Sequence, residues 1–141
     1  MLIWRRIEGS AVAANARRPN LLEMAQGFLD LSREEMAVGY DGDDYRRIRD
    51  AAEKAYLAAL QAVDHAMARH GLIPEPGAMA HASRHRFLEK AGRRDLSAHL
   101  STFADALHGR VFYMGDIPSR ESLSLSLDEV AQFIRTVSEE L

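Results

Sequence analysis

The chain has 141 residues, enough for one domain whose core needs no metal or disulfide to hold it together. Its formal net charge is −3, and the charges alternate along the chain, so no bulk positive field attracts nucleic-acid backbones. The absence of cysteine excludes disulfides, thiolate metal ligands and cysteine nucleophiles. No apolar run approaches the roughly 20 residues that span a bilayer, so we expect a cytoplasmic protein without a membrane partner.

The first predicted helix follows Pro19. Asn20 is a suitable N-cap, Glu23 occupies the third helical position, and apolar residues then recur at three-to-four spacing. These apolar residues are Leu21, Met24, Ala25, Phe28, Leu29 and Met36. We expect the helix to end near Gly39, before a turn at residues 41–44.

The longest predicted helix runs from Tyr45 to His70, and Gly71 provides its C-terminal stop. The turn before it ends in carboxylates, which the positive end of the helix dipole favours. One stripe of this helix is apolar and rich in alanine: Ile48, Ala52, Ala55, Tyr56, Ala59, Leu60, Val63 and Met67. The small side chains predict a close approach by a neighbouring helix.

Three further helices are predicted after a linker at 73–77, whose two prolines and glycine exclude helix. The first spans about 81–91 and the second about 95–113, with Asp95 as its cap. The second has an apolar face made of Leu96, Leu100, Phe103, Leu107 and Val111. The last begins at the capping box of Ser126 and Glu129, followed by the apolar stripe Val130, Phe133, Ile134 and Val137.

Strand patterns are nearly absent, so the sequence predicts an all-α fold. We expect a single domain over residues 1–141, built as a four- to five-helix up-and-down bundle. Residues 1–17 are the exception. Trp4 and Ile7 there could pack on the bundle, and residues 11–16 could form a helical turn or an N-terminal arm.

Two histidines are the first candidates for chemistry. His81 and His85 are four residues apart on a predicted helix, which puts both imidazoles on one face where Glu89 could add a third metal ligand. Arg84 and Arg86 flank His85 and would repel a cation. We therefore favour a solvated helix face and predict no metal and no cofactor.

Arg94 and His99 are the predicted catalytic pair. An arginine can bind a phosphate group and a histidine can act as general acid and base, a combination suited to RNA backbone cleavage. Arg93 is a second candidate for the arginine. The alternative is structural, because such spacing arises easily in an arginine-rich chain and a titratable histidine is only a probabilistic indicator of function.

His108, Arg110 and Tyr113 form a second candidate site near the end of the fourth predicted helix. Their side chains could line a pocket, and Gly109 between them would let another backbone approach. The alternative is that Phe112 and its neighbours cap the core as packed aromatic groups. The sequence contains no phosphate loop, nucleophile elbow, dinucleotide fingerprint or zinc-protease helix.

The order of these elements resembles the HEPN-like helical bundles, including their small uncharacterised bacterial members. The resemblance rests on the long helix with residues 49–59, the turn at 71–74, the segment 87–90 and two closing helices, and it covers about two thirds of the chain. It implies a helical bundle that is commonly a homodimer. Catalytic members cleave RNA with an arginine and a histidine four to six residues apart, a spacing that Arg94 and His99 match.

In that family the arginine and histidine lie nearer the final helix pair, where this chain has His108 before Arg110. We therefore favour a non-catalytic interaction or accessory module over the alternative, a metal-independent ribonuclease that uses Arg94 and His99. The resemblance implies a homodimer, through the alanine-rich or aromatic helix faces, and a protein partner such as a nucleotidyltransferase or an antitoxin. RNA is an expected partner only for the ribonuclease.

Overall fold

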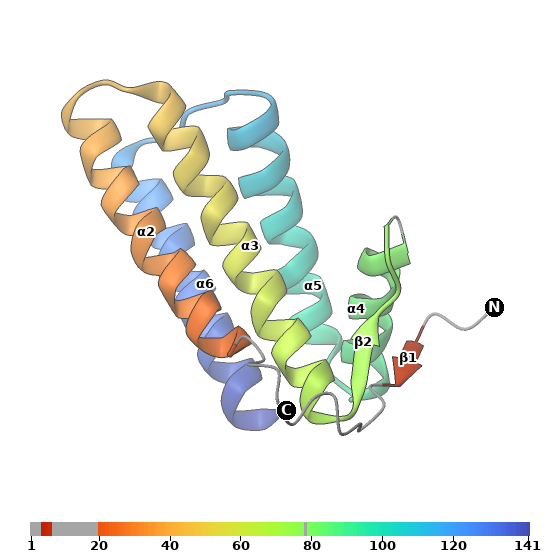
Figure 1. Ribbon diagram of the computed structural model, residues 1–141. Coiled ribbons are helices and arrows are strands. Elements are labelled where there is room, and N and C mark those ends of the chain that lie inside the picture. The colour runs from red at the N-terminus through yellow and green to blue at the C-terminus, as the bar shows by residue number, and fades with distance from the viewer. Residues whose placement is uncertain (1–3, 7–19, 78) are drawn as a thin grey trace.

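The computed structural model describes residues 4–6, 20–77 and 79–141. Its long helices run alternately up and down in a bundle (Figure 1): α2 (Leu21–Asp41), α3 (Tyr45–Arg69), α5 (Arg94–Phe103) continued by η1 (Ala104–Tyr113), and α6 (Arg120–Glu140). The shorter α4 (Met79–Lys90) lies at one end of the bundle. The prediction of an all-α bundle is confirmed for this part of the chain.

Helix α2 begins as predicted and ends two residues later than predicted. The Asn20 Oδ1 atom accepts hydrogen bonds from the backbone nitrogens of Leu22 and Glu23 at 3.1 and 3.2 Å. Gly39 does not stop the helix, which continues to Asp41. A Cβ atom on Gly39 would lie 2.8 Å from Cγ1 of Ile48, so glycine is needed there for α3 to approach.

Helix α3 is the centre of the bundle, and every residue of its predicted apolar stripe is buried. Seven of its alanines are at most 1% exposed: Ala51, Ala52, Ala55, Ala58, Ala59, Ala62 and Ala66. On α2, Ser32 is also fully buried, and its Oγ donates a hydrogen bond of 2.6 Å to the carbonyl oxygen of Ala51. The alanine-rich face is therefore covered inside the bundle, and the expectation that it forms a dimer surface is wrong.

The linker predicted to be non-helical contains strand β2 (Leu72–Pro74). It pairs antiparallel with β1 (Trp4–Arg6), with Trp4 opposite Pro74 and Arg6 opposite Leu72. Part of the expected N-terminal arm is therefore a short ribbon against the end of α3. The predictions for Ile7 and for residues 11–16 lie outside the described residues.

The fourth predicted helix has two parts with different hydrogen bonding. It begins at Arg94, with Asp95 in its first turn and not as its cap, and becomes the π-helix η1 at Ala104. At its end the Met114 nitrogen donates to the Gly109 carbonyl at 3.0 Å, a bond five residues back along the chain. The predicted apolar face is buried along both parts.

The predicted start of the last helix is wrong. The N-cap of helix α6 lies seven residues earlier, where the Ser119 Oγ accepts a hydrogen bond from the Ser122 nitrogen at 3.1 Å. Ser126 lies inside the helix, and its Oγ donates back to the Ser122 carbonyl at 3.2 Å. Leu123 and Leu127 are at most 1% exposed, so they extend the apolar stripe by two turns.

Helices long and apolar enough to cross a membrane are absent from the described residues.

Candidate functional sites

A groove between α5 and α6 contains His99, one of the two residues predicted to be catalytic. The groove has a volume of about 510 Å³. Its floor includes Phe103 and Phe133, whose rings meet edge to face with centroids 5.4 Å apart. The exposed side chains of Asp95 and Glu129 lie on its α5 and α6 walls. Both helices contribute residues about one turn apart, so the groove runs along the two helices.

Arg94 is exposed and is absent from the residues that line this groove. It is five residues from His99, and at 3.6 residues per turn this separation turns the two side chains roughly 140° apart around α5. The structure therefore does not bring the predicted catalytic pair together.

Arg93 lines the groove but is held by two carboxylates. Its Nε and Nη2 donate to the two oxygens of Asp95, both at 3.0 Å, and its Nη1 donates to Glu140 at 2.6 Å. These hydrogen bonds hold the pKa of the Asp95 carboxyl below its usual range and raise the pKa of the Arg93 guanidinium. Arg93 is therefore already paired inside the molecule and is not available as a phosphate-binding cation.

The groove as a whole is acidic. The residues that line it include one arginine, Arg93, and three carboxylates, those of Asp95, Glu129 and Glu140. With His99 neutral, the net charge of these residues is −2. This charge would repel an RNA phosphate. The ribonuclease stays a prediction that rests on the sequence spacing of Arg94 and His99, without support from the geometry of this groove.

His108 and Tyr113 lie together on η1, as the second candidate site requires. Their rings meet edge to face with centroids 4.8 Å apart, and the ring of Tyr56 lies 5.1 Å from that of His108. The His108 Nδ1 atom is 2.7 and 2.9 Å from the two oxygens of Glu53 on α3. These contacts hold η1 against α3, and neither His108 nor Tyr113 lines the groove between α5 and α6.

Arg110, the third residue of that candidate site, has a different partner. It is exposed and forms a long ion pair of 3.9 Å with Asp105. A different arginine, Arg49 of α3, caps the C-terminal end of η1. It donates hydrogen bonds to the carbonyl oxygens of Phe112 and Tyr113 at 2.8 and 3.1 Å. Cations stabilise helix C-termini in this way, which gives the region a structural role.

The two histidines weighed as metal ligands have separate partners. His81 Nδ1 lies 3.4 Å from the Tyr56 hydroxyl, and His85 Nδ1 lies 2.7 Å from the Ser97 Oγ. Burial lowers the pKa of His85, which favours the neutral imidazole that shares a hydrogen bond with Ser97. Groups of three or more side chains suited to a metal ion are absent from the part of the chain that the structure describes.

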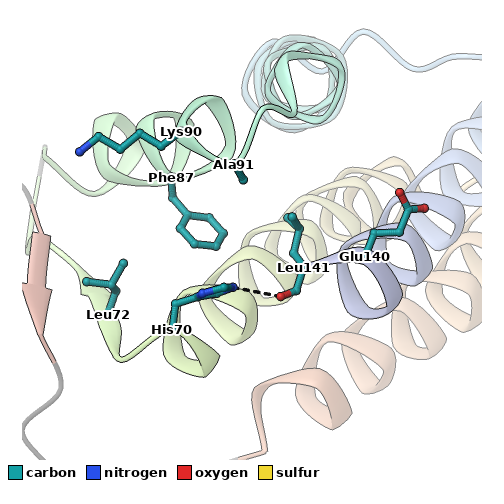
Figure 2. A pocket seen from close by; sticks show the side chains of 7 residues that line it. All are labelled: His70, Leu72, Phe87, Lys90, Ala91, Glu140 and Leu141. Atoms are coloured by element: carbon teal, nitrogen blue, oxygen red, sulfur yellow. Dashed lines mark hydrogen bonds between the residues drawn. The ribbon is translucent and has the colours of Figure 1, made fainter.

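A second cavity, of about 530 Å³, lies where α3, β2, α4 and α6 meet. Figure 2 shows Phe87 and Leu72 pointing into it from two sides. At its edge the His70 Nε2 atom is 3.1 Å from the Leu141 carbonyl oxygen. Its walls are mainly apolar, and the histidine contact ties the end of α6 to the end of α3.

The outer face of α2 is the third region of interest, defined by Met24, Gly27, Leu31, Glu34 and Val38. Its three apolar side chains recur every seven residues and are 39, 46 and 49% exposed in chain order. Gly27 lies between them in the helix, and a Cβ atom on it would meet no atom of the rest of the described protein within 4 Å. Nothing in the described protein therefore requires glycine at this position.

The carboxylates of α2 divide into two groups. Those that turn toward neighbouring helices are paired: Glu35 with Lys54 and Asp41 with Arg120. The exposed Glu23, Asp30 and Glu34 have no ion pair among the described residues. The outer face of α2 is therefore an exposed apolar stripe beside unpaired negative charge.

This surface was not predicted, because Met24 belongs to the predicted apolar face of α2 and Leu31 and Val38 have no part in that pattern. The interval of seven residues among the three was the available signal, since seven residues are close to two helical turns and place them on one side.

Comparisons of the chain with family models, curated proteins and solved structures found no match.

Proposed function

We propose that this protein is a non-catalytic interaction module that binds a basic amphipathic helix of a partner protein along the outer face of α2. The observation that carries the proposal is the exposed stripe of Met24, Leu31 and Val38 beside the unpaired carboxylates of α2. Peptide helices commonly bind by laying an apolar face on such a stripe.

The geometry of the stripe favours a helix as the occupant. Apolar residues at seven-residue intervals stay on one side of α2 and match a second helix that lies along it. Gly27 lies one turn from both Met24 and Leu31, so it lets the backbone of a partner helix approach closely. An exposed glycine inside a helix destabilises that helix, and close approach by a partner gives it a physical role.

The charge of the surface selects the chemistry of the partner. Glu34 occupies the position between Leu31 and Val38, and Asp30 lies beside the stripe, so lysine or arginine on the partner would be complementary. A second copy of the same face would bring like charges together. We therefore prefer a basic helix of another protein to a second copy of this chain as the occupant of this surface. The homodimer stays a prediction.

The HEPN-like family and a link to toxin–antitoxin systems belong to this proposal as hypotheses. The family rests on the resemblance in the sequence, and the link to toxin–antitoxin systems rests on the family. Under them, the basic helix would come from a nucleotidyltransferase or an antitoxin.

The test uses a labelled peptide of three heptads with leucine at the a and d positions and lysine at the flanking positions. We expect it to bind the protein in fluorescence anisotropy, and a peptide with glutamate in place of lysine to bind at least about tenfold more weakly. Leu31→Gln should weaken binding of the lysine peptide by about tenfold or more. The matched control is Leu125→Gln, which changes a leucine on α6 that is 63% exposed, compared with 46% for Leu31, and should leave binding unchanged.

Equal effects of the two leucine variants, or no binding of the lysine peptide, would contradict the proposal. Sedimentation of the protein alone provides the other decisive outcome. A dimer that Leu31→Gln dissociates would replace the basic helix with a second copy as the occupant of this face.

A further inference from the structure

The acidic groove between α5 and α6 has an uneven distribution of charge along its length. Glu129 lies at one end, and the cluster of Arg93, Asp95 and Glu140 lies at the other with one net negative charge. Glu129 and Glu140 are eleven residues apart, which is close to three turns and places them on one side of α6, about 16 Å apart. The groove therefore has two negative ends separated by a long middle section.

The middle section is apolar at its floor and polar at its walls. Leu96, Phe103 and Phe133 are at most 4% exposed and form the floor. Along the walls lie His99 and the hydrogen-bonded pair of Gln132 and Thr136, whose side chains are 3.3 Å apart. The floor of this middle section can therefore pack against the methylene groups of a ligand, and its walls can accept hydrogen bonds from that ligand.

We propose that this groove binds a linear polyamine. The two terminal ammonium groups would lie at the negative ends, and the methylene chain would lie on the apolar floor between them. The volume of about 510 Å³ is within the usual range of small-ligand sites, about 300–1,000 Å³.

Other classes of small ligand fit the groove less well. An anion would meet the excess of carboxylates. A compact divalent metal ion needs several carboxylate or imidazole ligands around one point, and no such group of three occurs among the described residues. A linear ligand whose positive charges are separated along its length is the class of ligand that matches carboxylates far apart in the groove.

The test is calorimetric titration of the protein with spermine, a linear tetra-amine, at low ionic strength, where such contacts are least screened. Glu129→Gln should weaken spermine binding by about fivefold to tenfold, since it removes one negative end. The matched control is Asp128→Asn, which removes the neighbouring charge. Asp128 pairs with Arg33 on α2 and does not line the groove, so this variant should bind spermine like the parent.

A shorter amine and a further charge variant complete the test, and the charge variant separates this site from general attraction to negative charge. Putrescine, a short diamine that reaches only one end, should bind at least about tenfold more weakly than spermine. Glu34→Gln removes a carboxylate on the outer face of α2 and should leave spermine binding unchanged. The proposal is overturned if all three charge variants lose affinity equally, if the two amines bind alike, or if spermine does not bind.

Discussion

The two faces of α2 carry one glycine each, and the surroundings of the two glycines are opposite. On the inner face, a Cβ atom at Gly39 would overlap Ile48 of α3. On the outer face, a Cβ atom at Gly27 would meet none of the other elements that the structure describes within 4 Å. Glycine inside a helix costs about 0.5–1 kcal/mol relative to alanine. Contacts among the described residues account for this cost at Gly39, and none of them accounts for it at Gly27.

The largest expected effect is on the inner face. We expect Gly39→Ala to destabilise the protein by about 1–3 kcal/mol, because the added methyl group forces Ile48 and the α2–α3 packing to shift. Denaturant unfolding followed by circular dichroism measures the change. Unchanged or increased stability would show that the close approach at Gly39 does not matter for the fold.

The next effect concerns the buried hydroxyl of the inner face. Ser32→Ala should lower the free energy of unfolding by about 1 kcal/mol, because it removes the hydrogen bond to the Ala51 carbonyl. Ser126→Ala is the control, since that hydroxyl bonds only within its own helix at the surface. The same unfolding measurement should separate the two variants, and equal stabilities would contradict the role given to Ser32.

The smallest expected change in stability lies on the outer face and has the opposite sign. Gly27→Ala should stabilise the protein by about 0.5–1 kcal/mol, because alanine favours helix and meets no obstacle. The same change should weaken binding of the lysine peptide by about threefold or more, since the methyl group keeps a partner helix at a distance. Stabilisation without any loss of binding would mean that no helix approaches Gly27.

The inner face of the bundle could be predicted from the sequence, because burial follows the helical period. The apolar stripes of α3, α5 with η1, and α6 are buried as expected. The start of α6 was missed because Ser126 and Glu129 have the spacing of a capping box, whereas Ser119 is the actual N-cap. The π-helix was missed because its apolar residues keep a spacing close to that of an α-helix.

The candidate functional surfaces were harder to predict, because sequence spacing does not say which way side chains point or which groups they already bind. Arg94 and His99 have a suggestive spacing but lie on different sides of α5. Arg93 faces the groove, but Asp95 and Glu140 neutralise it. The stripe of Leu31 and Val38 was visible in the sequence, and its exposure became clear only once α3 and α6 were seen to cover the other side of α2.

The most direct test of docking on the outer face of α2 is a charge exchange at Glu34, measured by fluorescence anisotropy with the lysine and glutamate peptides. Glu34→Lys should weaken binding of the lysine peptide by about tenfold and strengthen binding of the glutamate peptide. The reason is that the substitution changes the charge of α2 at this position from negative to positive. Unchanged affinity for both peptides would contradict the proposal that a basic helix binds along α2.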